Sequence, residues 1–223
     1  MPVTMLIKIY DKVDKAAGGD GMRTIGITGG VGGGKSQILA YLKGHYNCEV
    51  ILADEVAHRI KEPGERCFGP LIELLGEEIL AVDKKIDKGK MAEKIFRDKA
   101  LLEQVNRLMH PMVKEYILEE KERLEKESHI DVLFIEAALL IEDGYGDVVD
   151  ELWYIYASEE DRLHRLKTSR EYSEEKIKAI FRQQLSEEEF RKHCRVVIDN
   201  SGSLEDAYGQ INNYMKRVLG ELL

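Results

Sequence analysis

Residues 24–36 read TIGITGGVGGGKS, and this stretch decides the fold of the 223-residue chain. Residues 24–28 form a short apolar, β-branched run that predicts a buried strand, and QILAYLK (37–43) predicts the first turns of a helix. Between them, residues 29–36 satisfy the pattern G-x-x-x-x-G-K-[ST]. A strand, a glycine-rich loop and a helix in this order are typical of a phosphate-binding loop, so residues 29–36 are called the phosphate loop below.

The phosphate loop predicts nucleotide binding. Its glycines let the backbone adopt positive φ angles and direct N–H groups at phosphate oxygens, and the following helix presents its positive end. Lys35 is expected to contact the β- and γ-phosphates of ATP, and the Ser36 hydroxyl is expected to bind Mg²⁺. The residues assigned to the nucleotide here are Gly29, Gly30, Val31, Gly32, Gly33, Gly34, Lys35, Ser36 and Gln37.

Four further apolar runs, at residues 50–53, 132–135, 152–157 and 196–198, predict buried strands that alternate with helical stretches. Such alternation predicts a parallel sheet. The fold class is therefore α/β, a three-layer P-loop NTPase with a central parallel sheet, a helical acceptor-binding insertion and a helical lid.

The organisation follows from the same pattern. We predict one kinase domain over residues 22–223, with core segments at 22–60, 130–157 and 194–223, an insertion at about 61–129 and a lid at about 158–193. Within the insertion, His110-Pro111 predicts a helix boundary, because a proline restricts the residue before it. Residues 1–21 are interpreted as an N-terminal appendage, for which disorder and an extra edge strand at residues 5–10 are both open.

Composition excludes several classes of protein. The net charge of -9 argues against nucleic-acid binding, which needs a surplus of Lys and Arg. The three cysteines form no CxxC pair, so they indicate neither a disulfide framework nor a zinc site. With no apolar run of about 18 residues and no signal-peptide pattern, we expect a cytoplasmic protein with a small-molecule substrate, without membrane or nucleic-acid partners, as a monomer or weak homo-oligomer.

Two acidic residues follow predicted strands and are candidates for chemistry. Asp54 follows the second strand, where it can accept the proton of an attacking hydroxyl or orient that hydroxyl. An N-cap for the helix that follows is an equally open interpretation. Glu136 ends the third strand, where a Walker-B-like acid would lie close to the metal. For Glu142, farther along, a surface loop position is the plainer interpretation.

The predicted lid carries the cations that phosphoryl transfer needs. Positive charge that closes over the phosphates stabilises the charge of the transition state and excludes water as a competing acceptor. Arg162 and Arg165 share a helix face, and Arg170 follows near the end of that helix. We assign catalysis to Asp54, Lys35, Arg165 and Arg170.

The chain resembles the dephospho-CoA kinase family from about residue 23 to its C-terminus. The segments that carry the resemblance are TGGVGGGKS (28–36), ADEVAH (53–58), EPGE (62–65), NRLMHP (106–111), ALLIE (138–142), the spacing of Arg165 and Arg170, Gln184, and VIDNSG (197–202). The resemblance implies ATP- and Mg²⁺-dependent phosphorylation of the ribose 3′-hydroxyl of dephospho-CoA, the last step of coenzyme A synthesis.

The resemblance also implies roles for single residues. Asp54 is then the base, Asn200 lies near the nucleotide base, Ser36 and Glu136 hold the metal, and the acceptor is bound by Asp54, His58, Lys88, His110, Leu139 and Glu142. The chain departs from the family pattern at Leu52, Ala138, Ile86-Asp87-Lys88 and Cys194-Arg195. Lys88 keeps a positive charge but lacks the planar fork of arginine.

Two alternatives stay open at this point. Another small-molecule kinase or a nucleoside monophosphate kinase of the same fold would use the same loop and lid, and only the acceptor separates them. A non-catalytic P-loop sensor would bind nucleotide without transfer. The sequence contains no NKxD motif of the kind that GTPase switches use to read their base.

Overall fold

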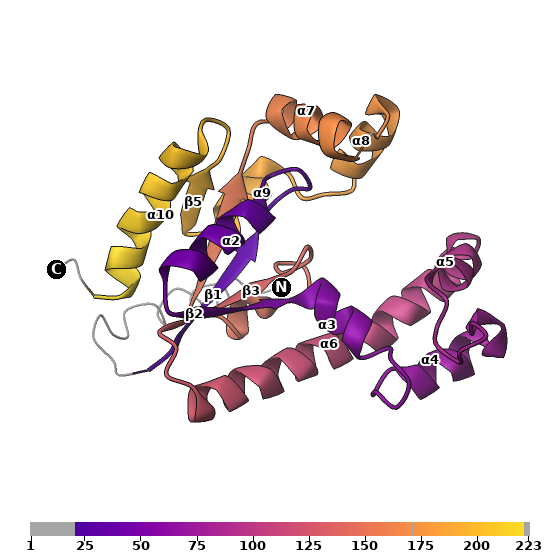
Figure 1. Ribbon diagram of the computed structural model, residues 1–223. Coiled ribbons are helices and arrows are strands. Elements are labelled where there is room, and N and C mark those ends of the chain that lie inside the picture. Colours follow the sequence, from indigo (N-terminus) through magenta and orange to yellow (C-terminus); the bar gives the residue numbers. More distant parts are fainter. Residues whose placement is uncertain (1–20, 171, 221–223) are drawn as a thin grey trace, which may run out of the picture. The chain divides into compact units, whose positions relative to one another are not determined.

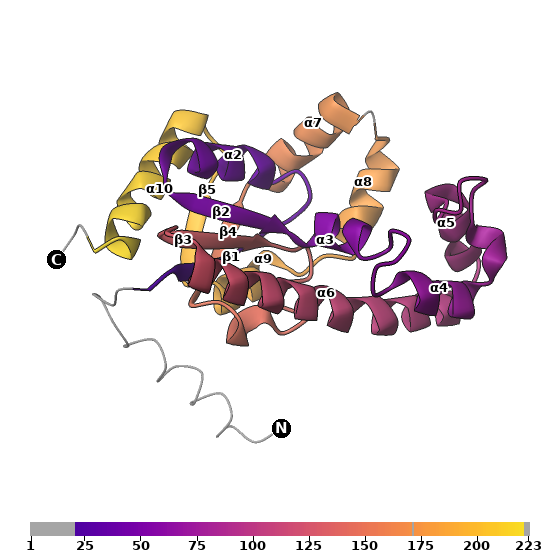
Figure 2. The same ribbon diagram turned by 60° about the horizontal axis from the view of Figure 1, so that its bottom comes forward.

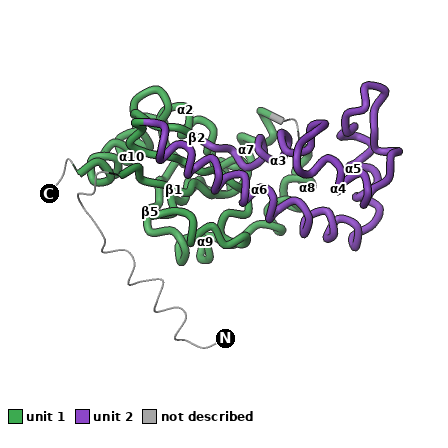
Figure 3. Tube along the Cα trace, turned by 90° about the horizontal axis from the view of Figure 1, so that it is seen from below, with its two compact units in different colours: residues 1–50, 129–223 green, residues 51–128 purple. Residues whose placement is uncertain are grey.

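The computed structural model describes residues 21–170 and 172–220, with the side chain of Arg170 left undescribed. The predicted appendage at residues 1–21 therefore lies outside the described residues, apart from Gly21. Two compact units make up the chain, one of residues 1–50 and 129–223 and the other of residues 51–128 (Figure 3).

The centre of the first unit is a five-stranded sheet with the order β2-β3-β1-β4-β5. Its strands are β1 (Arg23–Thr28), β2 (Cys48–Leu52), β3 (Val132–Glu136), β4 (Glu151–Tyr156) and β5 (Val196–Asp199). β1 pairs in parallel with β3 and with β4, and β4 pairs in parallel with β5. Ile25, Ile27 and Phe134 are fully buried, as expected for strands covered on both faces. The predicted parallel sheet and its strands are confirmed.

Helices cover both faces of this sheet. α2 (Lys35–His45) and α10 (Leu204–Val218) lie on one face and α9 (Glu187–His193) on the other (Figures 1 and 2). Tyr41 of α2 stacks on Tyr208 of α10 with 3.8 Å between the ring centroids, and Tyr154 of β4 stacks on Phe190 of α9 at 4.6 Å. The predicted three-layer α/β fold is confirmed.

The segment between β4 and β5 is helical. It consists of α7 (Glu159–Arg170), α8 (Glu174–Phe181) and α9. Ser173 and Ser186 cap α8 and α9, because each side chain accepts a hydrogen bond from the backbone N–H three residues later. These helices occupy the segment where the sequence predicts a lid. A short 3₁₀ helix, η2 (Tyr145–Asp147), lies between β3 and β4.

The second unit is helical. Its elements are α3 (Ala53–Arg59), α4 (Phe68–Leu75), the 3₁₀ helix η1 (Glu77–Ile79), α5 (Lys88–Phe96) and α6 (Lys99–Glu127). α3, α4 and α5 all contact α6, the 29-residue helix that forms the spine of this unit. Asp98 caps α6, since its side chain accepts hydrogen bonds from the backbone N–H groups of Ala100 and Leu101.

The predicted helix boundary at His110-Pro111 is wrong, because Pro111 lies inside α6. A proline within a helix removes one backbone hydrogen bond and costs about 3 kcal/mol. Met109 and Val113, on either side of it, belong to a buried stripe that continues through the proline. Burying such side chains contributes roughly 1.5–3 kcal/mol each, so packing along the stripe outweighs the local cost.

Candidate functional site

The phosphate loop connects β1 to α2 with the geometry that its glycines require. Gly34 is the N-cap of α2 with φ of 90°, and a Cβ there would collide with the side-chain amide of Asn200. The Gly33 N–H donates a hydrogen bond to the Gly30 oxygen at 3.0 Å, which closes the turn. Ser36 and Gln37 are exposed in the first turn of α2, where the positive end of the helix attracts anions.

Lys35 lies deep in this site and joins two elements of it. Its Nζ donates a hydrogen bond to the Gly29 oxygen at 2.8 Å and lies 3.5 Å from Oε1 of Glu136. Both side chains are largely buried, with 15% and 16% of their surface exposed. Glu136 ends β3 and pairs with Ile27 of β1, so the sheet register holds the carboxylate beside the loop. The structure therefore brings Lys35 and Glu136 together.

Asn200 and Arg165 meet on the other side of the loop. Nδ2 of the buried Asn200 donates a hydrogen bond to the Gly33 oxygen at 2.9 Å. Nη2 of Arg165 donates to the backbone oxygen of Asn200 at 2.6 Å, and its Nη1 lies 3.4 Å from the Gly32 oxygen. Oδ1 of Asn200 is buried without a hydrogen-bond partner among residues 21–170 and 172–220. A buried acceptor left in this way is costly.

Arg162 contacts the tip of the phosphate loop, although the sequence analysis did not assign it to catalysis. Its Nε donates to the Val31 oxygen at 2.9 Å, and its Nη2 donates to Oε1 of Gln184. The guanidinium carbon lies 4.1 Å from the ring centroid of Phe181, and burial lowers the pKa of Arg162. Arg170 is the last residue of α7, and its side chain is not described. The helix face that Arg162 shares with Arg165 was the signal available in the sequence.

Gln184 is the second residue of this site without an assigned role. It follows α8, where its backbone N–H donates to the Phe181 oxygen at 3.2 Å. Its Oε1 also accepts a hydrogen bond from the Val31 N–H at 3.3 Å. Residues separated by 153 positions therefore meet at the loop tip, a contact that no local sequence pattern predicts.

Asp54, the predicted base, is exposed in the first turn of α3. Its interpretation as an N-cap is wrong, because the cap position is Leu52 and no side chain caps this helix. Within the described part of the chain, the Asp54 carboxylate forms no hydrogen bond or ion pair. It is therefore free to bind a ligand hydroxyl.

His58 and Lys61 interact electrostatically with Asp54 in the second unit, and Lys88 acts on both of them. Burial is the main reason that the pKa of His58 is lowered, and the charges of Lys61 and Lys88 lower it further while Asp54 opposes them. The pKa of Lys61 is lowered by burial first and by Lys88 second. Neither lysine forms an ion pair with a carboxylate in the described segments. His58, Lys61 and Lys88, called the basic cluster below, thus form a basic surface beside Asp54 whose positive charge comes from the two lysines, and Lys61 is not among the residues predicted from the sequence.

The other predicted acceptor residues are spread over both units. His110 is half-buried on α6 in the second unit. Leu139 and Glu142 lie in the loop after β3, in the first unit, and both are exposed. Leu139 has 42% of its surface exposed, which is high for a leucine and leaves it available for contact with a ligand.

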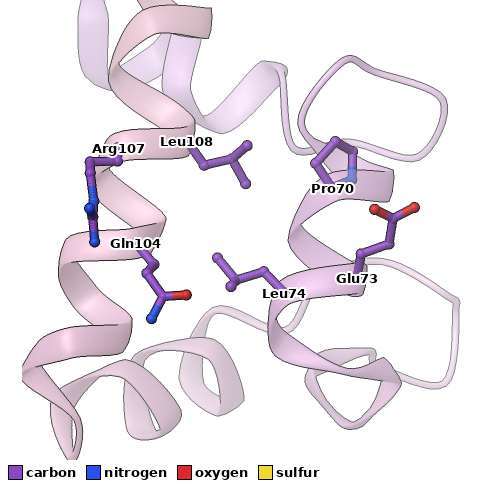
Figure 4. Close-up of a pocket in the computed structure, with 6 residues that line it drawn as sticks. All are labelled: Pro70, Glu73, Leu74, Gln104, Arg107 and Leu108. Carbon is purple, nitrogen blue, oxygen red and sulfur yellow. The ribbon is translucent and has the colours of Figure 1, made fainter.

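A hollow of about 530 Å³ lies between α4 and α6 in the second unit (Figure 4). The side chains of Leu74 and Leu108 extend into the space between the two helices. The residues that line it are Pro70, Glu73, Leu74, Gln104, Arg107 and Leu108. Its walls therefore combine apolar carbon with amide, guanidinium and carboxylate groups.

The described residues contain no cluster of three or more His, Cys, Asp or Glu side chains that could hold a metal ion. None of their helices combines the length and apolar character needed to span a bilayer.

Known proteins share both sequence and structure with this chain. The dephospho-CoA kinase family model matches residues 23–206. A dephospho-CoA kinase of Oceanobacillus iheyensis is 33% identical over 193 residues, which cover 86% of this chain and 96% of that protein. A dephospho-CoA kinase of Carboxydothermus hydrogenoformans is 34% identical over 193 residues, covering 86% of this chain and 93% of the other.

Solved structures of known proteins are also similar to this chain. A crystal structure of a Thermus thermophilus protein superposes with a TM-score of 0.72 at 31% identity and covers 91% of this chain and 99% of that one. The dephospho-CoA kinase of Campylobacter jejuni, at 24% identity, has a TM-score of 0.67, covers 89% of this chain and 98% of its own, and supports the fold. The family match and the identities to named relatives show that the chain belongs to the dephospho-CoA kinase family.

Proposed function

We propose that this protein transfers the γ-phosphoryl group of ATP to the ribose 3′-hydroxyl of dephospho-CoA, giving coenzyme A and ADP. Family membership over residues 23–206 supports the acceptor. The observation that carries the phosphoryl transfer is the convergence of Lys35, Arg162 and Arg165 on one glycine loop. Three cations around a loop of backbone N–H groups suit a polyphosphate. As a step of coenzyme A synthesis, the reaction is expected in the cytoplasm, with the protein a monomer or weak homo-oligomer.

On the nucleotide side, the phosphate loop binds the β- and γ-phosphates and Lys35 exchanges its Gly29 contact for phosphate oxygens. Arg162 and Arg165, with Arg170 as a further cation, stabilise the charge that develops during transfer. Asn200 is assigned to the nucleoside end by the family resemblance, and its hydrogen bond to the Gly33 oxygen would join that end of the site to the phosphate loop.

Ser36 and Glu136 are the residues proposed to hold Mg²⁺. Mg²⁺ is usually bound by one or two protein oxygens and completes its octahedron with water and phosphate oxygens, so a hydroxyl and one carboxylate beside the loop fit it. Glu136 lies beside the loop through its contact with Lys35. When bound, the ion neutralises phosphate charge.

On the acceptor side, Asp54 holds the 3′-hydroxyl and accepts its proton as the oxygen forms a bond to the γ-phosphorus. The bond from that phosphorus to the β-γ bridging oxygen breaks, and ADP leaves. His58, Lys88 and Lys61 of the basic cluster bind the acceptor diphosphate, with His110, Leu139 and Glu142 as further acceptor contacts. The positive cluster beside Asp54 supports this arrangement, because a diphosphate next to the reacting ribose needs cations there.

The proposed acceptor can be tested against the two alternatives. ADP release should be rapid with dephospho-CoA and should stay near the rate of background hydrolysis with AMP or with water alone. Turnover with AMP but not with dephospho-CoA would support a nucleoside monophosphate kinase. Tight ATP binding without turnover on either acceptor would support a sensor.

The hollow between α4 and α6 is the proposed site of the pantetheine arm, whose dimethyl group and amides match its mixed walls. Leu108→Asp is therefore expected to raise KM for dephospho-CoA about tenfold with little change in kcat, because one lost apolar contact is worth roughly 1–3 kcal/mol. Steady-state kinetics with varied acceptor measure this.

Leu118→Asp is the matched control, since Leu118 lies on the same helix, is 39% exposed and does not line the hollow. Equal rises in KM in both variants would show that the hollow is not part of the acceptor site.

A further inference from the structure

The side-chain oxygen of Gln184 accepts two hydrogen bonds at the tip of the phosphate loop. One comes from the Val31 N–H at 3.3 Å and the other from Nη2 of Arg162. A backbone N–H of a phosphate loop and a guanidinium are both donors that phosphate oxygens commonly accept from in proteins. The carboxamide oxygen therefore has the surroundings of a phosphate oxygen.

Arg162 is positioned at this tip without a charge partner. Its guanidinium lies so close to Gly30 that a Cβ at that position would collide with it. Among the described residues, no carboxylate forms an ion pair with Arg162, which contacts the Val31 oxygen, Gln184 and the Phe181 ring. A guanidinium has five N–H donors, and two are used in these hydrogen bonds. A half-buried arginine without an ion pair beside a phosphate loop is suited to bind an anion.

We propose that Gln184 is a positioning residue whose Oε1 takes the place of a nucleotide phosphate oxygen until ATP binds. It keeps Arg162 and the Val31 N–H aligned at the loop tip, and a phosphate oxygen then replaces it on both donors. The inference rests on the proposed function only in that ATP is the ligand. A neutral amide suits this role because its hydrogen bonds to the two donors are weaker than those of a phosphate oxygen, so the phosphate can replace it.

The proposal predicts opposite results for two substitutions. Gln184→Glu places a carboxylate on the same two donors, so it should compete with ATP and raise the Kd for ATP at least about tenfold. Gln184→Met has a similar shape but no oxygen, so it removes the competition and should leave the Kd for ATP equal to or below that of the unaltered protein. Gln184→Met should still lower kcat, because Arg162 is no longer aligned.

Titration calorimetry with ATP, without acceptor, measures these constants, so the result does not depend on dephospho-CoA as substrate. Gln183→Glu is the matched control, because Gln183 is exposed in the same turn and should leave Kd unchanged. An unchanged Kd in Gln184→Glu would overturn the proposal. So would a rise in Gln184→Met as large as that in Gln184→Glu, which would make Gln184 a purely structural residue. If the unaltered protein failed to bind ATP, the proposed function would fall first, and this inference with it.

Discussion

Replacing Asp54 by asparagine is expected to lower kcat by about two to four orders of magnitude and to leave the affinity for ATP nearly unchanged. Asparagine has the same shape as aspartate but cannot take the proton of the ribose hydroxyl. The carboxylate forms no hydrogen bond or ion pair in the described part of the protein, so little structure depends on it. The measurements are kcat at saturating ATP and dephospho-CoA, and the Kd for ATP by calorimetry.

Glu55→Gln is the matched control for this substitution. Glu55 is the neighbouring exposed acid in the first turn of α3 and makes the same favourable interaction with the positive end of the helix. Both variants should therefore lose the same small part of helix stability, and only Asp54→Asn should lose turnover. Near-normal turnover in Asp54→Asn would show that Asp54 is a surface residue of α3 without a catalytic role.

Replacing Lys35 by alanine is expected to have the largest effect on the nucleotide side. The substitution removes the cation that contacts the transferred phosphoryl group, together with its contact to the Glu136 carboxylate. Loss of one transition-state donor typically lowers kcat by about 10²–10³-fold, and the loss of a positive charge beside the phosphates should also weaken ATP binding. Both kcat and the Kd for ATP should change.

Lys43→Ala is the control for general charge effects, because Lys43 is an exposed lysine of the same helix with a 3.9 Å contact to Glu49. It should leave both constants near those of the unaltered protein. If Lys35→Ala changed neither constant, the loop at residues 29–36 would not be the nucleotide site.

Much of the fold could be predicted from the sequence because its strongest signals are local. Strands buried on both faces must be apolar along their whole length, so β1 and β3 were evident as continuous runs. The phosphate loop is evident because its glycines, Lys35 and Ser36 are contiguous in the sequence, and Gly34 adopts a left-handed backbone that favours glycine. Constraints of this kind can be read without knowledge of distant parts of the chain.

The predictions that were wrong concern positions where a local signal is overruled by the rest of the structure. The effect of Pro111 on its helix is local, whereas the buried stripe that keeps α6 continuous extends on both sides of it, so the local signal predicted a boundary that does not exist. Asp54 was ambiguous for a similar reason, since an acid at a helix start suits a cap as well as a base. The N-cap position falls on Leu52, which excludes the cap, and the role of Asp54 as base remains a proposal.

The choice among the lid arginines also depended on distant contacts. The sequence placed Arg162 and Arg165 on one helix face but could not tell which guanidinium reaches which part of the loop. That depends on Gln184 and Asn200, whose contacts with the loop join residues separated by 153 and 167 positions. Lys61 was not predicted as a site residue because its neighbour in the basic cluster, Lys88, is 27 positions away and begins a different helix, α5.

The position of the new phosphate on the product tests the central claim most directly. After incubation of the protein with ATP, Mg²⁺ and dephospho-CoA, phosphorus NMR should show a new monoester signal coupled to the ribose H3′, growing in step with ADP. This result is expected if the chain is the kinase proposed here. A monoester at the 2′ position, or ADP released without a new ester on dephospho-CoA, would contradict the account.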